Sequence, residues 1–142
     1  MRKWIALIAV IIVAAGALMV RHMMTPPDGL DMARSKVTEA GHFVVAVAPE
    51  AGADIPQGPM HNWIIEVKTP DGMPVEGAGI AIDGGMPQHG HGLPTVPQMT
   101  ADLGQGRYRI EGVRFNMGGW WEFKLAITAG GMTDRVTFNL VL

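Results

Sequence analysis

The chain has 142 residues, which is enough for one ordinary domain beside a short terminal segment. It contains no cysteine, which excludes disulfides, thiolate metal sites and cysteine nucleophiles, and its only serine, Ser35, lies in a polar segment unsuited to a hydrolase. Beyond residue 23, eight Lys and Arg stand against thirteen acids, and this balance of −5 argues against a nucleic-acid partner.

Residues 1–22 are predicted to be a membrane anchor or a signal segment. A basic pair precedes seventeen uncharged, mostly apolar residues, 4–20, which is the lower limit for a bilayer-spanning helix. A secretory signal has the same basic start and apolar run, and residues 15–17 resemble a cleavage site. Because the apolar run continues to Val20, we favour an uncleaved single-pass anchor in the cell membrane. The rest of the chain would then face the periplasm or the cell exterior.

Residues 23–40 are polar and carry Pro-Pro and Asp-Gly turn signals. They are predicted to form an irregular tether with a short helical turn over residues 31–37.

From residue 41 onward the pattern is that of β-strands, with turn signals every 8–15 residues. About seven short strands are expected, over residues 43–47, 61–69, 75–82, 97–101, 107–113, 121–127 and 136–142. The side chains predicted to fill the core are Trp63, Ile65, Tyr108, Ile110, Phe123, Leu125, Phe138 and Leu140. The pattern predicts an all-β, immunoglobulin-like antiparallel β-sandwich over residues 41–142. Pattern alone does not separate a sandwich from a small barrel.

Residues 83–94 hold four glycines, two prolines and two histidines, and this composition predicts a long loop without a ladder strand. His89 and His91 stand two residues apart, so an extended backbone would turn both imidazoles to one side. Two such nitrogen ligands can bind a soft or borderline metal. The alternative is a packed structural loop.

Five phrases carry a family resemblance: His61-Asn62-Trp63, Pro70–Val75, the Met-Pro-x-His-Gly-His-Gly loop, Gly106-Arg107-Tyr108 and Asn116–Trp121. Together they resemble the YtkA-like family of small exported domains, which is related to the FixH-like proteins, over residues 41–142. The resemblance implies an immunoglobulin-like sandwich on a membrane anchor. FixH-like proteins are linked with the assembly of copper-containing respiratory oxidases, so it also implies a link to copper.

A copper site without cysteine has to be built from imidazole and thioether, and this donor set selects Cu(I), whereas imidazole alone also suits Cu(II) and Zn(II). His89 and His91 are the predicted ligands, Met86 is the favoured third donor, and Met99 or His61 stands in reserve. The alternatives are that both methionines fill the core and that His61 is hydrogen-bonded in a polar rim.

These observations predict a membrane-anchored periplasmic domain that binds copper, or assists copper delivery to a respiratory or other membrane complex. The alternative is a non-catalytic, metal-free interaction module that docks on a membrane complex. An enzyme is not expected, because no carboxylate pair, cysteine or identifiable general base is present.

Overall fold

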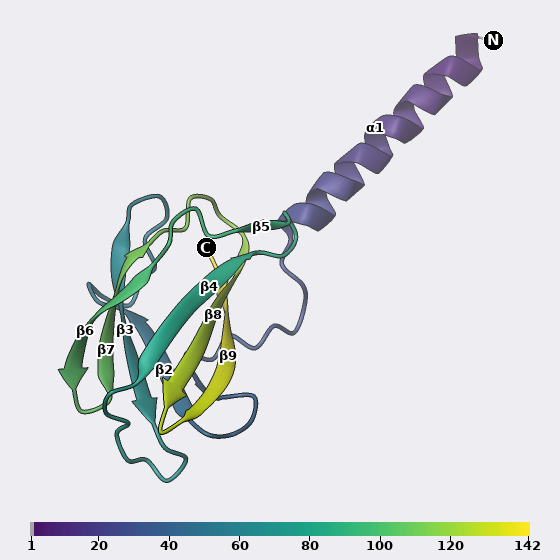
Figure 1. Ribbon diagram of the computed structural model, residues 1–142. Coiled ribbons are helices and arrows are strands. Elements are labelled where there is room, and N and C mark those ends of the chain that lie inside the picture. Colours follow the sequence, from purple (N-terminus) through teal and green to yellow (C-terminus); the bar gives the residue numbers. More distant parts are fainter. Residues whose placement is uncertain (1) are drawn as a thin grey trace.

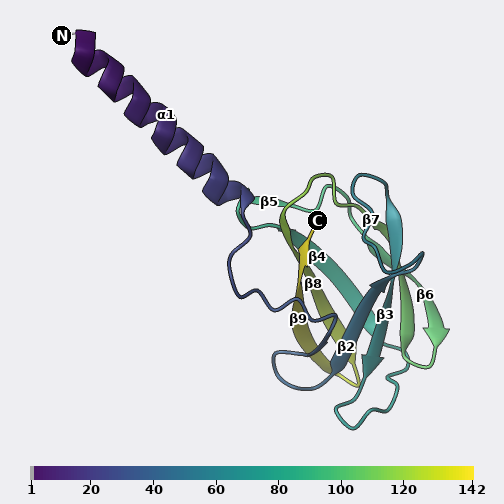
Figure 2. The same cartoon turned by 180° about the vertical axis from the view of Figure 1, so that it is seen from behind.

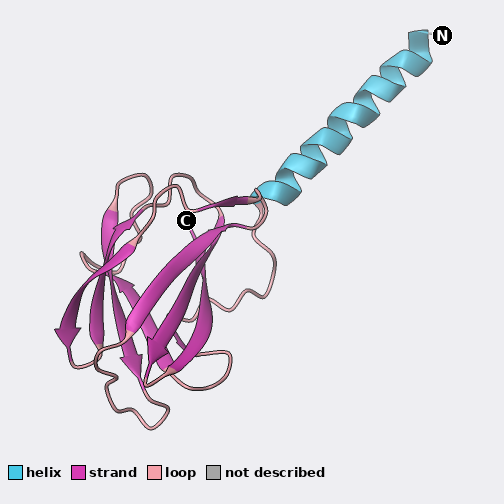
Figure 3. Cartoon of the chain, viewed as in Figure 1, coloured by secondary structure: helices cyan, strands magenta, loops and turns pink. Residues whose placement is uncertain are grey.

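The computed structural model describes residues 2–142 and contains one helix, α1, and nine strands (Figures 1 and 3). The mostly-β class predicted from the sequence is confirmed. The elements are α1 Arg2–Met24, β1 Ser35–Val37, β2 Val44–Pro49, β3 His61–Lys68, β4 Gly79–Met86, β5 His91–Gly92, β6 Gln98–Gly104, β7 Arg107–Val113, β8 Trp120–Ala129 and β9 Met132–Val141. About seven strands were expected, and the two extra ones, β1 and β5, are three and two residues long. Strands of two or three residues are too short to show an alternation of apolar and polar residues in the sequence.

Two antiparallel sheets pack face to face as a sandwich. The five-stranded sheet has the order β1-β2-β3-β7-β6 and the four-stranded sheet the order β5-β4-β8-β9. All eight side chains predicted for the core are buried, with at most 1% of their surface exposed. The alternating positions of each strand therefore point inward as the sequence indicated.

The prediction of a strand-free loop over residues 83–94 is wrong. Strand β4 continues to Met86, four residues beyond the predicted end of that strand, and His91–Gly92 pairs with Gly85–Met86. Gly85 explains the error, because a Cβ there would collide with the carbonyl oxygen of His91. The glycine permits a close backbone approach between β4 and β5, and does not loosen the chain at this point.

The predicted helical turn over residues 31–37 is also wrong. Residues Ser35–Val37 form β1, whose partners are Val44–Ala46 of β2. The later part of the expected tether is therefore an edge strand of the sandwich. A three-residue strand depends on its neighbour for its structure and not on local propensity.

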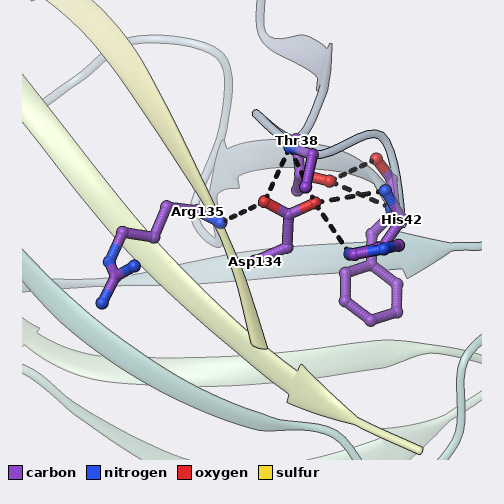
Figure 4. A network of polar contacts seen from close by, with 6 residues as sticks. Thr38, His42, Asp134 and Arg135 are labelled. Atoms are coloured by element: carbon purple, nitrogen blue, oxygen red, sulfur yellow. Dashed lines mark hydrogen bonds and ion pairs between the residues drawn. The ribbon is translucent and has the colours of Figure 1, made fainter. Parts of the chain in front are cut away.

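A buried carboxylate fixes the turn between β1 and β2 (Figure 4). Asp134 of β9 accepts hydrogen bonds from the backbone N–H groups of Ala40 and His42, at 3.0 and 3.1 Å. Burial alone would raise the pKa of Asp134. Hydrogen bonds from the Thr38 hydroxyl and from the N–H groups of Ala40, His42 and Arg135 outweigh it and hold that pKa well below its usual range.

Helix α1 projects away from the sandwich, and its C-terminal end lies beside β5 (Figures 1 and 2). Just after the helix, the Gln88 side-chain amide donates to the Thr25 carbonyl oxygen at 2.8 Å. Across residues 2–142, no helix combines the length and the apolar character needed to cross a bilayer. The membrane anchor stays a prediction.

Candidate metal centre

The two candidate imidazoles lie on the tight hairpin that joins β4 to β5. Met86 ends β4 and is the ladder partner of His91 in β5. The backbone N–H groups of His89 and Gly90 both donate to the Met86 carbonyl oxygen, at 3.1 and 3.0 Å. This turn brings the rings of His89 and His91 to a centre-to-centre distance of 6.0 Å. A turn, and not the extended backbone considered from the sequence, places them together.

That separation suits a single metal ion. An imidazole nitrogen binds a metal at about 2 Å, so two imidazoles on one ion have ring centres roughly 5–6 Å apart. In His91, Nδ1 lies 3.1 Å from the Gly92 carbonyl oxygen. A carbonyl oxygen only accepts, so this contact favours the tautomer that carries its proton on Nδ1 and keeps the lone pair on Nε2. Nε2 of His91 is therefore the atom available for coordination.

His91 rests on an aromatic row that crosses this end of the core. Its ring meets Trp121 edge to face at 5.8 Å, and Trp121 meets Phe115 at 5.2 Å. Trp121 is buried, and its indole N–H donates to the Met117 carbonyl oxygen at 3.0 Å. The row fixes the base of the hairpin while the His91 side chain stays exposed.

Met86 is a core side chain, with 1% of its surface exposed. A Cβ on Gly119 would lie only 2.9 Å from the terminal methyl of Met86, so that methyl packs against the backbone before β8. Because Met86 is the ladder partner of His91, both side chains leave the hairpin on the same face. Its role as a sulfur donor stays a prediction, and the packing role is the one that the structure shows.

The two reserve donors do not join the hairpin imidazoles. Met99 lies in β6 of the five-stranded sheet, opposite Ile110, and packs partly buried against the core. The ring of His61 lies 5.7 Å from Phe115 and 6.2 Å from Trp63.

Within the described residues, Nε2 of His61 is buried without a hydrogen-bond partner, while its Nδ1 lies 3.1 Å from the Pro59 carbonyl oxygen. His61 therefore lies beside the aromatic row, with one ring nitrogen hydrogen-bonded and the other buried.

A residue that the sequence analysis did not propose, Met117, lies at this end. It lines a hollow of about 390 Å³ together with His89 and the chain terminus at Leu142. The available signal was the phrase Asn116–Trp121, but nothing in its spacing pointed to His89.

Carboxylates and histidines alone do not make a metal site here. Among the side chains that the structure describes, no group of three or more His, Cys, Asp or Glu could hold a metal ion. The methionines are the chain's source of a further soft donor beside the two imidazoles.

Comparison with known proteins supports the family resemblance. The YtkA-like family profile matches residues 43–126. The chain belongs to the YtkA-like family. No curated protein matches the sequence.

The structure is similar to that of a DUF4426 family protein from Pseudomonas aeruginosa PAO1, with a TM-score of 0.53 and 13% identity over 77% of this chain and 94% of the other. At this identity the similarity concerns the fold alone.

Proposed function

We propose that this YtkA-like protein is a membrane-anchored domain, facing the periplasm or the cell exterior, that binds copper and assists its delivery to a membrane complex. The observation that carries the proposal is the pair of imidazoles of His89 and His91. Their ring centres are 6.0 Å apart, on a hairpin where Nδ1 of His91 lies 3.1 Å from the Gly92 carbonyl oxygen.

Copper is the metal that this donor chemistry favours. The chain has no cysteine, so soft donors can come only from its methionines. Imidazole with thioether selects Cu(I), whereas carboxylate and carbonyl oxygen suit Mg²⁺ and Ca²⁺. Copper would be cargo that the domain receives and passes on.

The finer fold and the anchor are parts of this proposal. Two antiparallel sheets in the order observed support an immunoglobulin-like sandwich. The exposed apolar side chains of α1, between Leu7 and Val20, support insertion of the helix into a membrane. Because α1 ends beside the hairpin, an inserted helix would hold the hairpin at the membrane surface (Figure 2). A membrane complex would then meet the domain at the copper site.

The hairpin suits transfer better than storage. β5 has only two residues and His91 is exposed, so an incoming acceptor can reach the ion. The turn before it is held by two backbone hydrogen bonds to the Met86 carbonyl oxygen, so the rings lie near each other before an ion binds.

The test is a Cu(I) competition titration of the full chain in detergent, under reducing conditions. We expect the parent to compete with a chelator and the double variant His89→Ala/His91→Ala to lose this ability. His42→Ala is the matched control, because His42 lies beside Asp134 and away from the hairpin.

A third variant separates ligation from packing. His91→Phe keeps a ring on Trp121 but removes the nitrogen donor, so it should remain as stable as the parent and lose most of its Cu(I) affinity. Unchanged affinity in His91→Phe and in the double variant would contradict the proposal.

The alternative function, a metal-free interaction module docking on a membrane complex, has its own supporting observation. The contact of His91 with buried Trp121 stabilises the hairpin without any ion. Full stability with no copper binding in the parent would favour this alternative.

A further inference from the structure

The loop between β7 and β8 faces the hairpin across a shared hollow of about 390 Å³. Its lining residues are Pro26, His89, Met117, Gly118, Gly119, Val141 and Leu142. His91 lines a separate hollow on the same hairpin, together with Met86 and Gly90.

The backbone of Met117 is fixed while its side chain is not packed away. Its carbonyl oxygen accepts the Trp121 indole N–H at 3.0 Å, and Gly119 exchanges backbone hydrogen bonds of 2.9 and 3.1 Å with Leu142. The side chain nevertheless keeps 36% of its surface exposed. Exposure alone does not set Met117 apart, since Met132 is 44% exposed, but Met117 lines a hollow together with His89.

We infer that Met117 is a thioether ligand of the proposed copper site, and that it gives the site its preference for Cu(I). The donor set is then two imidazole nitrogens, from His89 and His91, and one sulfur. Thioether sulfur is a soft donor that binds Cu(I) well, while Cu(II) binds well to imidazole without it. This inference rests on the proposed function and adds the residue that sets its choice of oxidation state.

The decisive comparison is Met117→Leu against Met132→Leu, in the full chain in detergent. Leucine keeps a similar apolar volume without sulfur. Met132 is a matched exposed methionine, 44% exposed, at the start of β9 in the β8–β9 hairpin. Removing a residue that only hydrogen-bonds to a metal ligand typically weakens metal binding by about 10–100-fold. Removing a ligand itself should cost at least as much, so Met117→Leu should bind Cu(I) at least about tenfold more weakly than the parent. Met132→Leu should bind Cu(I) like the parent.

Two further readouts distinguish a ligand from a structural residue. Cu(II) affinity should stay within about threefold of the parent in Met117→Leu, because imidazole supplies that binding. In the parent chain with ¹³C-labelled methionine methyls, Ag(I), a redox-inert ion of the same charge as Cu(I), should shift the Met117 methyl signal and leave the Met132 signal in place. The Met117 signal is assigned as the one that is missing from the spectrum of Met117→Leu. If that variant does not fold, the signal is assigned in the parent chain from its contacts with neighbouring nuclei.

The outcomes separate the two proposals. A parent that binds no Cu(I) overturns the proposed function and the Met117 inference together. A parent that binds Cu(I) with the same affinity as Met117→Leu, or whose Met117 methyl does not respond to Ag(I), overturns the inference alone. An equal loss of Cu(I) and Cu(II) affinity in Met117→Leu also overturns it, because the residue would then act through structure.

Discussion

The hydroxyl of Tyr108 connects β7 to the segment that leads into β4, and its removal tests how the sandwich is held together. It donates to the Val75 carbonyl oxygen at 2.5 Å and accepts the Ala78 backbone N–H at 3.0 Å. Tyr108 is fully buried, and Val75 and Ala78 are also buried. The change Tyr108→Phe keeps the ring and removes only this oxygen.

The expected loss of stability follows from the two groups left behind. Each buried donor or acceptor without a partner costs about 1–3 kcal/mol, and phenylalanine leaves one of each without its side-chain partner. Small backbone shifts recover part of this cost. We therefore expect Tyr108→Phe to lower the free energy of unfolding by about 2–4 kcal/mol.

Chemical denaturation of the full chain measures this loss, and Thr128→Val, which removes an exposed hydroxyl of β8, should change stability by less than about 0.5 kcal/mol. A loss below about 1 kcal/mol in Tyr108→Phe would refute the reasoning, because the two bonds would not be stabilising a buried pair.

The pH dependence offers a second check, because Tyr108 is the only tyrosine and its ionisation can be followed by absorbance. Burial raises the pKa of Tyr108 above its ordinary value of 10.0, although the hydrogen bond from Ala78 lowers it in part. The folded chain thus favours the neutral hydroxyl. Its contribution to stability is complete below pH 10.0 and is lost as the pH rises above that value. Tyr108→Phe should lack this alkaline loss, and an ordinary tyrosine titration in the folded chain would contradict the assignment.

Three further predictions concern the core, the acid limit of stability and the anchor. Phe123→Ala should cost about 3–5 kcal/mol in denaturation, while Val141→Ala, 43% exposed on the neighbouring strand, should cost below about 1 kcal/mol; similar losses would mean that the strand registers are wrong. The pKa of Asp134 is lowered in the fold, so its stabilisation is present above the usual carboxyl value of 3.8 and is lost as the pH falls below it. Asp134→Asn should therefore be less stable at neutral pH and lose less stability on acidification, and parallel acid profiles of the two chains would count against the network in Figure 4. Mass spectrometry of the mature chain should find residues 4–20 retained, and a new N-terminus at Leu18 or nearby would show that the segment is a cleaved signal.

The core could be predicted from the sequence because strand periodicity is a local property. Phe123 and Leu125 alternate with the polar Glu122 and Lys124, and they point inward whatever their strand's partner is. The loop prediction failed for the opposite reason. The role of Gly85 depends on a second backbone, that of His91, which approaches it only after the hairpin forms.

The residues of the candidate site could likewise be predicted only where they are close together in the chain. His89 and His91 are neighbours in the chain, so a short-range argument could propose them together. Met117 reaches the hairpin through the pairing of β4 with β8, in which Gly85 stands opposite Glu122. That register brings the loop before Trp120 to the end of β4, and one sequence gives no means of reading it. The strand β1 was missed on similar grounds, because Asp134, far along the chain, holds the turn that follows it.

The register also decides which parts of the site are rigid. Seven consecutive residues of β4, Gly79–Gly85, are paired with β8, so Met86 and the base of the hairpin are held by the body of the sandwich. His91 is seated on Trp121, whereas His89 belongs to the turn and borders the open hollow with Met117. An ion bound here would meet His91, seated on Trp121, on one side and the residues that line the hollow on the other. Such a site keeps part of the preorganisation that affinity needs and leaves one open path for release. This asymmetry lies at the end of the sandwich nearest α1, where a membrane-bound acceptor would approach (Figure 1).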